Sequence, residues 1–217
     1  MSGKKKSEPE GLIEPPTEAD FEVTVADLKK SNVPPLFFNA TREEILNMGV
    51  PYSMKSEYRI AWRYANEILE NAKLGKGLLL QGSVGTTKTT LAVAILQEAL
   101  KCRLSGYFLS MIGVLRFFNS KRDQHREEFA RLQNKLISCS VLVLDDLGAE
   151  YLNDWDKDHV DYIIGERYNR KKALIITTNL REKDIAAKYG ERIYDRLRAM
   201  CGEPILLVGE SLRKGSL

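Results

Sequence analysis

Five short apolar segments most strongly limit the folds that this chain can adopt. Within each segment the apolar residues follow one another instead of alternating with polar ones, which is typical of strands covered on both faces. The stretches between them repeat apolar residues at helical spacing, as crossover helices between parallel strands do. The segments are GLLLQ (77–81), GYFLS (106–110), VLVLD (141–145), ALIITT (173–178) and PILLV (204–208). The sequence therefore predicts an α/β fold in which helices sandwich a five-stranded parallel sheet.

Two amphipathic stretches indicate which helix residues should be buried. The stretch 56–73 predicts one helix whose buried side carries Ile60, Tyr64, Ile68 and Leu69. The stretch 159–172 predicts a helix with Val160, Ile163, Ile164 and Tyr168 inside and with Arg167, Arg170, Lys171 and Lys172 outside.

The segment GSVGTTKTT, which follows the first expected strand, is similar to a phosphate-binding loop. The usual motif, G-x-x-x-x-G-K-[ST], places backbone N–H groups around phosphates, a lysine on the outer phosphates and a hydroxyl on Mg²⁺. Gly82, Lys88 and Thr89 are in register with this motif. The simpler alternative is a glycine-rich turn before an ordinary helix. The strand before the loop and the helical pattern after it favour a nucleotide site, because a helix N-terminus directs free N–H groups at such a loop.

Thr87 stands where the motif has its second glycine. Glycine tolerates a positive φ and close approach of the backbone to phosphate, whereas a β-branched residue does neither easily. Strain of about 1–3 kcal/mol would weaken nucleotide affinity roughly 5- to 150-fold. We therefore expect weakened binding of ATP and Mg²⁺ rather than none. The expected binding residues are Gly82, Ser83, Val84, Gly85, Thr86, Thr87, Lys88, Thr89 and Thr90.

Two carboxylates, Asp145 and Asp146, end a buried strand, where α/β folds bind ligands. Asp145, opposite Lys88 and Thr89, is expected to hold Mg²⁺. Asp146 could orient or deprotonate the attacking water, a role commonly given to Glu, so slow hydrolysis is expected. The alternative is two acidic residues that merely end a strand.

Further polar residues follow the next strand and the helix after it. Asn179 could hold the attacking water or could cap a helix. Arg192 and Arg196 lie four residues apart on one helix face. They could pair with Glu191 and Asp195, or one could act in a neighbouring protomer as an arginine finger.

Taken in order, GSVGTTKTTLA, VLVLDDLGAE, ALIITTNL, GERIYDRLR and GESLRKG resemble the DnaC/IstB-like AAA+ ATPases over roughly residues 48–217. That group comprises bacterial replicative-helicase loaders of the DnaC and DnaI type and the transposition helper IstB. The resemblance implies an AAA+ P-loop NTPase fold and ATP hydrolysis. The chain stops just after the last strand, so the C-terminal helical lid of larger AAA+ proteins is expected to be missing.

The resemblance also implies roles for single residues. Lys88 and Thr89 would be P-loop residues, Asp145 the Mg²⁺ carboxylate, Asp146 the hydrolytic carboxylate, Asn179 sensor 1, Arg196 the finger with Arg192 as second choice, and Arg213 a sensor-2-like arginine. Single-stranded DNA is the macromolecular ligand that it implies. Cations and aromatics interleave, as in stacking grooves, at Arg116, Phe117, Phe118, Lys121 and Arg122. The alternative is that Leu115, Phe118 and Phe117 pack a helix against the core.

Composition supports a simple organisation. The net charge of +3 permits contact with nucleic acid without arguing for it, and three widely separated cysteines suggest neither a disulfide framework nor a zinc site. No apolar stretch approaches the roughly 20 residues that span a bilayer, so a cytoplasmic protein without membrane association is expected. We expect a disordered tail (1–20), a short partner-binding or linker region (21–57) and the ATPase core (58–217).

Three functions remain open. Small-molecule kinases also use P-loops, but they do not need the TTN and GERIYDRLR elements, so we rank that function last. The leading hypothesis is a helicase loader for DNA replication initiation, an ATP-dependent homo-oligomer that delivers the replicative DNA helicase. The second is an IstB-like transposition helper, whose partner is a transposase. The third is a non-hydrolysing, nucleotide-binding adaptor, because of Thr87 and the aspartate at 146.

Overall fold

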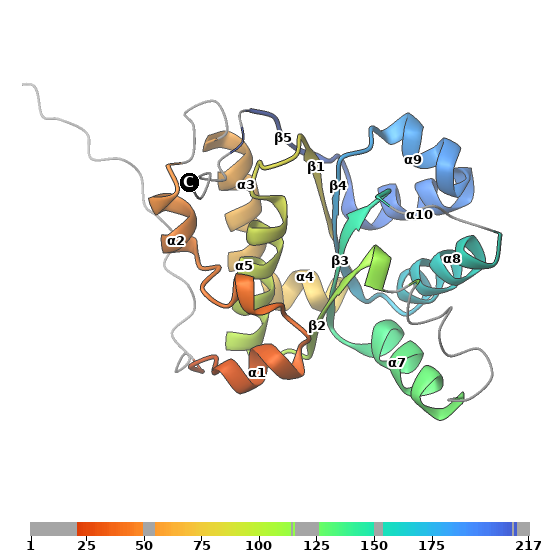
Figure 1. Ribbon diagram of the computed structural model, residues 1–217, viewed down its shortest axis with the longest axis horizontal. Coiled ribbons are helices and arrows are strands. Elements are labelled where there is room, and N and C mark those ends of the chain that lie inside the picture. The colour runs from red at the N-terminus through yellow and green to blue at the C-terminus, as the bar shows by residue number, and fades with distance from the viewer. Residues whose placement is uncertain are drawn as a thin grey trace, which may run out of the picture.

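The computed structural model describes residues 21–49, 55–113, 115, 126–149, 154–209 and 211. Within these ranges the five expected strands form one parallel sheet in the order β2-β3-β4-β1-β5 (Figure 1). The predicted sheet is therefore confirmed. The strands are β1 Leu78–Gly82, β2 Gly106–Ser110, β3 Val141–Leu147, β4 Ala173–Thr178 and β5 Ile205–Leu207.

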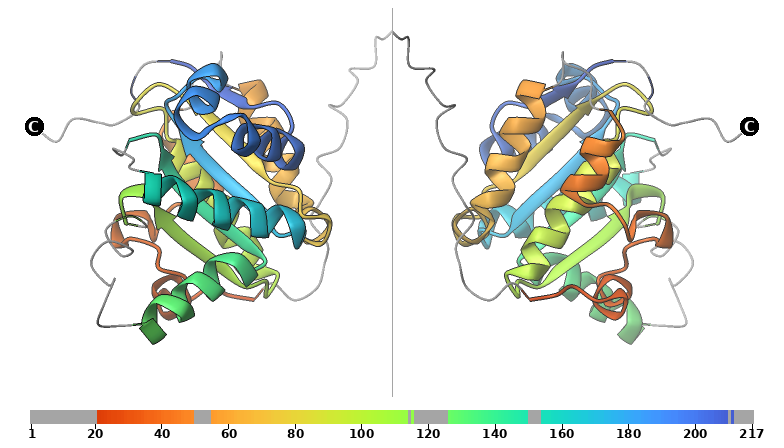
Figure 2. Two further views of the ribbon diagram at one scale, coloured as in Figure 1. Left: turned by 90° about the vertical axis from the view of Figure 1, so that its right-hand side faces the viewer. Right: turned by 90° about the vertical axis from the view of Figure 1, so that its left-hand side faces the viewer.

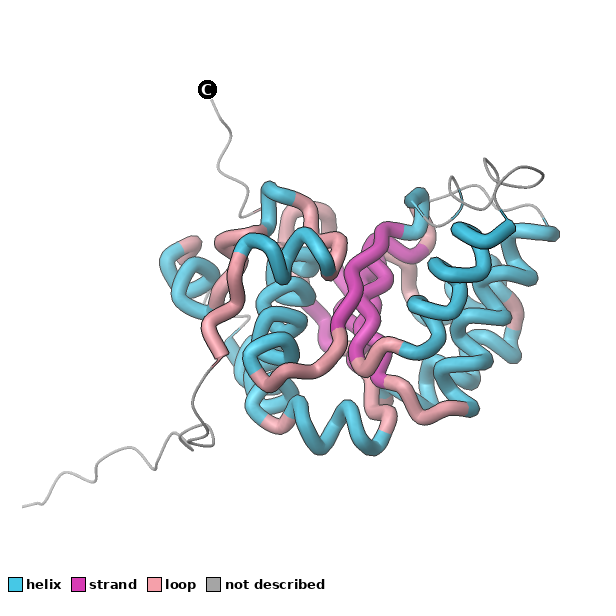
Figure 3. Tube along the Cα trace, turned by 90° about the horizontal axis from the view of Figure 1, so that it is seen from below, coloured by secondary structure: helices cyan, strands magenta, loops and turns pink. Residues whose placement is uncertain are grey.

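Helices cover both faces of the sheet. Figure 3 shows the strands between two sets of helices, and the two views of Figure 2 face one set each. One set contains α3 Lys55–Asn66, α4 Ile68–Leu74 and α5 Lys88–Lys101. The other contains α7 Arg126–Ser138, α8 Asp154–Asn169, α9 Glu182–Tyr189 and α10 Glu191–Cys201. Among the described residues, no helix follows β5, and none is long and apolar enough to cross a membrane.

Side chains of the central strands alternate between two apolar cores. In β1, Leu78 and Leu80 pack with α3 and α5, whereas Leu79 packs with the helices of the opposite face. In β4, Ile175 and Ile176 divide in the same way. This two-sided burial is the reason that the strands have continuous apolar sequences.

The N-terminal elements cover the edge of the sheet that β2 forms. These elements are α1 Val25–Lys30, the 3₁₀-helix η1 Pro35–Phe37 and α2 Arg42–Asn47. The Phe108 N–H of β2 donates to the Ser31 carbonyl over 2.8 Å, and Asn32 Nδ2 donates to the Phe108 carbonyl over 2.9 Å. These bonds satisfy backbone groups that an edge strand would otherwise leave unpaired.

The same elements share the apolar core of the rest of the chain. Leu28, Val33, Ala40 and Ile45 are buried in one cluster with the side chains of α3 and α5. The division that we expected between residues 57 and 58 falls inside α3. Residues 21–49 and the core are thus packed together.

The stretch 56–73 forms two helices instead of the single helix that we predicted, with a turn at Glu67 between them. Tyr64 and Ile68 are buried as expected, but Ile60 and Leu69 are 53% and 47% exposed. The prediction was wrong for these two side chains. The face of α3 that packs inward carries instead Tyr58, Ala61, Trp62, Tyr64 and Ala65.

The prediction for α8 was correct for Val160, Ile163 and Ile164 but wrong for Arg167 and Tyr168. Arg167 is fully buried, while Tyr168 is 44% exposed. The Arg167 guanidinium donates to the Leu136 carbonyl over 2.6 Å and to the Cys139 carbonyl over 3.0 Å, and it also reaches the Ala173 carbonyl. The Leu136 and Cys139 carbonyls lie at the C-terminal end of α7, where the helix dipole favours a cation, and the Ala173 carbonyl lies at the start of β4. Hydrogen bonding therefore keeps inside a residue that its charge alone would place outside.

Candidate nucleotide-binding site

The phosphate loop joins the carboxyl end of β1, which lies between β4 and β5, to the N-terminus of α5. Two of its glycines are required by close contacts. A Cβ atom at Gly82 would lie 1.9 Å from the Leu207 carbonyl oxygen, and one at Gly85 would lie 2.1 Å from Ser211 Oγ. Since real Cβ atoms do not approach other atoms so closely, a larger residue at Gly82 would require a shift of the loop or of β5, and one at Gly85 would require a shift of the loop or of Ser211.

Thr87 adopts the left-handed backbone conformation, with φ 60° and ψ 17°. The expectation that this position requires a positive φ is therefore confirmed, and its effect on nucleotide affinity stays a prediction. The Thr87 hydroxyl donates to the Thr86 carbonyl over 2.7 Å and also contacts the hydroxyl of Tyr58 in α3. The Thr87 carbonyl accepts the first backbone hydrogen bond of α5, from the Leu91 N–H over 2.9 Å.

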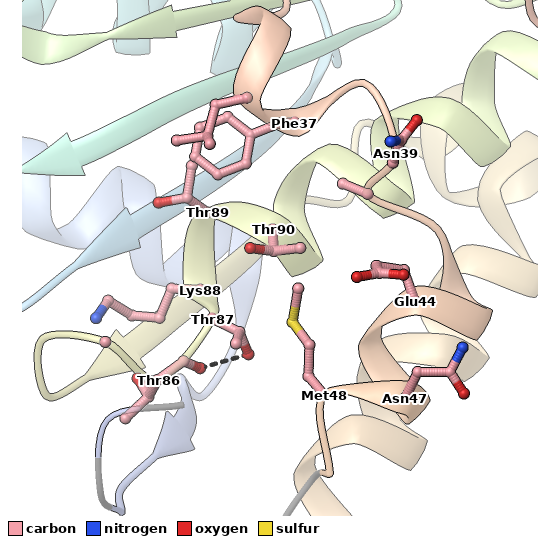
Figure 4. Close-up of a pocket in the computed structure, with 13 residues that line it drawn as sticks. Phe37, Asn39, Glu44, Asn47, Met48, Thr86, Thr87, Lys88, Thr89 and Thr90 are labelled. Atoms are coloured by element: carbon pink, nitrogen blue, oxygen red, sulfur yellow. Dashed lines mark hydrogen bonds between the residues drawn. The ribbon is translucent and has the colours of Figure 1, made fainter. Parts of the chain in front are cut away.

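Lys88 and Thr89 begin α5. The Lys88 ammonium donates to the Gly82 carbonyl over 3.0 Å and to the Ser83 carbonyl over 2.6 Å, so its side chain curls back over the loop and away from α2 (Figure 4). The Thr89 hydroxyl lies near the Asp145 carboxyl group and acts on its pKa, as the charge of Lys88 does. The structure thus brings together the lysine, the hydroxyl and the carboxylate that the motif predicted.

Asp145 lies at the carboxyl end of β3 and is held by a short hydrogen-bond chain. Its Oδ1 accepts from the Thr177 hydroxyl over 2.7 Å, and that hydroxyl accepts from the Asp146 N–H over 2.8 Å. Burial raises the pKa of the Asp145 carboxyl above its usual range, although the hydrogen bond from Thr177, the nearby Thr89 hydroxyl and the charge of Lys88 act in the opposite direction. Thr177 is a polar contact to which the sequence assigned no role.

Asp146 and Asn179 lie beside this chain. The pairing of β3 and β4 shifts register between Leu144 and Leu147, and Asp146 within the shift has φ 60°. The Asn179 amide donates to Asp146 Oδ1 over 3.4 Å. The two side chains that we expected to act on the attacking water are therefore neighbours.

A cavity of about 660 Å³ opens between the phosphate loop and the N-terminal elements. Figure 4 shows the loop and the start of α5 on one side and α2 on the other. No sequence pattern indicated this wall, because its residues precede the loop by about 40 positions and carry no motif. The lining residues are Leu36, Phe37, Asn39, Ala40, Glu44, Asn47 and Met48, together with residues 85–90.

Arg192 and Arg196 of α10 bind neither Glu191 nor Asp195. Both pair instead with Asp161 of α8, and Arg196 Nη1 lies 2.7 Å from Asp161 Oδ1. The Arg192 side chain is 70% exposed and that of Arg196 is 24% exposed. Neither arginine is among the residues that line the cavity.

Several expected site residues lie outside the described ranges. They are Arg116, Phe117, Phe118, Lys121, Arg122 and Arg213. Leu115, just before the expected DNA-binding segment, is buried, as the packing alternative proposed for that residue.

Known proteins resemble this chain over most of its length. A family model described as IstB-like ATP binding protein matches residues 68–215. The replicative helicase loader DnaC of Escherichia coli (strain K12) is 28% identical over 123 residues, which are 55% of this chain and 49% of the relative. The replicative helicase loader DnaI of Bacillus subtilis (strain 168) is 29% identical over 153 residues, which are 64% of this chain and 48% of the relative. The chain spans about half the length of these curated relatives.

The fold has a counterpart among solved structures. A crystal structure of the DnaC helicase loader matches with a TM-score of 0.66 and 29% identity, covering 82% of this chain and 100% of that one. This likeness confirms the predicted AAA+ P-loop NTPase fold. Because the family model matches more than half of the 217 residues, the chain belongs to the family of IstB-like ATP binding proteins.

Proposed function

We propose that this protein binds ATP with Mg²⁺ in the cavity beside the phosphate loop. The observation that carries the proposal is the grouping of Lys88 and Thr89 at the N-terminus of α5 with Asp145, whose pKa both residues lower. A cation for phosphates and oxygen donors for Mg²⁺ form a set that suits a magnesium nucleotide. The volume of about 660 Å³ lies in the range of small-molecule sites. Bound Mg²⁺ would neutralise phosphate charge.

We also propose that the protein hydrolyses ATP, slowly or with stimulation by DNA. Asp146 and Asn179 would hold and activate the water, which is supported by the hydrogen bond between them. Arg196, with Arg192 as second choice, would act on the nucleotide of a neighbouring protomer in an ATP-dependent homo-oligomer. Arg213 would be the sensor-2-like arginine of the same reaction.

The biological role that we propose is loading of the replicative helicase in the cytoplasm at the initiation of DNA replication. The similarity to the loaders DnaC and DnaI supports this role. Single-stranded DNA would bind at the segment that contains Arg116, Phe117, Phe118, Lys121 and Arg122. An IstB-like helper that partners a transposase is the second candidate, and the family model favours it. The left-handed Thr87 favours the third, a nucleotide-binding adaptor without turnover.

ATP turnover by the purified protein, with and without single-stranded DNA, tests the enzymatic part of the proposal. We expect turnover that DNA stimulates and that Lys88→Ala lowers at least about 100-fold, since the lysine would contact the phosphates. The Thr87→Gly protein should bind ATP more tightly than the natural protein, because glycine adopts φ 60° without strain. Turnover found only in the Thr87→Gly variant would replace the enzyme by the adaptor.

Binding of the partner is tested separately. The protein, loaded with ATP, is mixed with purified replicative helicase or with purified transposase of the same organism, and the complexes are separated by size. The loader role requires a stable complex with the helicase. A complex with the transposase alone would establish the helper role instead.

A further inference from the structure

Tyr58 of α3 contacts the loop at the position where threonine replaces the second glycine. The side chain is buried, with 4% of its surface exposed, and its hydroxyl meets the Thr87 hydroxyl. The Thr87 hydroxyl has one proton, which it donates to the Thr86 carbonyl over 2.7 Å. Tyr58 must therefore be the donor in its contact with Thr87. A chain of two hydrogen bonds runs from the phenol of α3 to the backbone of the loop.

This chain holds one peptide group of the loop in a single orientation. The Thr86 carbonyl accepts a hydrogen bond from the Thr87 hydroxyl, and that hydroxyl contacts Tyr58 of α3. Because a trans peptide is planar, with its C=O and N–H on opposite sides, the Thr87 N–H points away from Tyr58. The Thr86 side chain is also held, since its hydroxyl donates to the Ser83 carbonyl over 2.9 Å. Both ends of the Thr86–Thr87 segment are thereby fixed.

We propose that Tyr58 is a positioning residue for the phosphate loop: its hydroxyl anchors Thr87 and so keeps the Thr87 N–H directed at the phosphates of a bound nucleotide. The inference rests on the proposed nucleotide binding, and it explains how a loop with a β-branched residue at φ 60° keeps one conformation. Burial raises the pKa of the Tyr58 phenol, so the hydroxyl keeps its proton as a donor at neutral pH. A glycine at position 87 has no hydroxyl, so the role of Tyr58 exists only when Thr87 is present.

This dependence is measurable with a double-mutant cycle. The natural protein, Tyr58→Phe, Thr87→Gly and the double variant are titrated calorimetrically with ATP and Mg²⁺. We expect Tyr58→Phe to weaken affinity roughly 3- to 10-fold beside Thr87, the effect of one lost hydrogen bond, and less than about 2-fold beside glycine. Tyr64→Phe is the matched control, because Tyr64 lies on the same helix and donates to the Lys76 carbonyl over 2.8 Å, in the turn before β1. It should change affinity less than about 2-fold.

The outcomes separate the inference from the proposed function. If Tyr58→Phe lowered ATP affinity equally in the natural protein and in the Thr87→Gly variant, or did not lower it in the natural protein, Tyr58 would only pack α3. The inference would then fail, while ATP binding stood. Binding by Thr87→Gly but not by the natural protein would also overturn the inference, because Tyr58 would not compensate for Thr87. If neither protein bound ATP, nucleotide binding itself would be wrong.

A second pair of variants keeps the test valid if Tyr58→Phe does not fold. Thr87→Val removes the acceptor but keeps the shape of the side chain, whereas Thr87→Ser keeps the hydroxyl. We expect Thr87→Val to bind ATP roughly 3- to 10-fold more weakly than Thr87→Ser. Equal affinities of the two variants would contradict the proposal.

Discussion

Two residues at the candidate nucleotide site, Thr87 and Asp146, have a left-handed backbone with φ 60°. Residues other than glycine seldom adopt this conformation, which costs on the order of 1 kcal/mol or more and persists only where neighbours hold it. Here Tyr58 contacts the Thr87 hydroxyl, and the Thr177 hydroxyl accepts from the Asp146 N–H. Asp145, next to Asp146 in β3, has a carboxyl whose pKa burial raises. The strained backbones of Thr87 and Asp146 and the desolvated carboxyl of Asp145 therefore lie together where we propose that ATP binds.

Because the Asp145 carboxylate is desolvated, Asp145→Asn should stabilise the nucleotide-free protein while it weakens ATP binding. Because the folded-state pKa is raised, ionisation of Asp145 costs stability at pH values above that pKa, and the cost disappears below the unfolded pKa of about 3.9. Asp145→Asn should therefore raise the Tm of the nucleotide-free protein at pH 7, with a gain that shrinks as the pH falls towards about 4. The same variant should lose Mg²⁺-dependent ATP binding at least about 10-fold.

Thermal unfolding followed at several pH values, together with ATP titration, checks this prediction. Asp161→Asn is a suitable control for the pH dependence, because Asp161 pairs with Arg192 and Arg196 instead of lying in the nucleotide site. A lower Tm for Asp145→Asn at pH 7 would contradict the argument from desolvation.

At the scale of secondary-structure elements, Arg167 joins α8 to the end of α7 and to the start of β4. Its guanidinium binds carbonyls of Leu136, Cys139 and Ala173 inside the protein. Desolvation lowers the pKa of Arg167 from its ordinary value, but an arginine remains charged at neutral pH. The cation thus satisfies several buried acceptors at once, a task that no apolar side chain could perform.

Arg167→Met should destabilise the protein by about 2–4 kcal/mol, because it leaves buried carbonyls without donors. Arg170→Met is the matched control on the same helix. Arg170 is exposed and, within the described ranges, pairs with Glu166 four residues earlier, so its loss should change stability by less than about 1 kcal/mol. Urea unfolding of both variants gives the comparison, and equal midpoints would show that the buried bonds contribute little.

At the scale of the whole molecule, the sheet separates two sets of helices that carry different expected site residues (Figure 1). The cavity lies with α2 and α5 on one side, whereas Arg192 and Arg196 lie on α10 on the other and pair with Asp161 of α8. An arginine that acts on a neighbour's nucleotide must belong to a head-to-tail contact between protomers. We propose that α10 provides this contact.

A mixing experiment tests that arrangement. Arg196→Ala should lower turnover on the order of 10³-fold while ATP affinity of the isolated protomer stays within about 2-fold. Lys88→Ala also removes turnover, but it disables the phosphate loop, which the neighbouring protomer brings to the same contact. An equal mixture of the two variants should recover about a quarter of the natural activity, since one random contact in four joins an intact loop to an intact arginine. A mixture as inactive as its components would place the arginine outside the catalytic contact.

The sequence by itself determined the strands, the parallel α/β class and the residues of the phosphate loop. These features are local, because apolar periodicity and motif spacing can be read within one short segment. The lysine, hydroxyl and carboxylate also follow from sequence, since parallel strands deliver their carboxyl ends to one edge of the sheet.

Only the tertiary structure decided which distant partners complete these residues. Tyr58 contacts Thr87 from 29 positions away, Arg167 reaches carbonyls of Leu136 and Cys139, and Asp161 binds the arginines of α10. The wall of the cavity formed by η1 and α2 is likewise a product of packing. Helical periodicity assigns a side chain to the inside or the outside by its polarity, so it cannot anticipate a buried cation that is satisfied by carbonyls or a hydroxyl that finds its acceptor on another element.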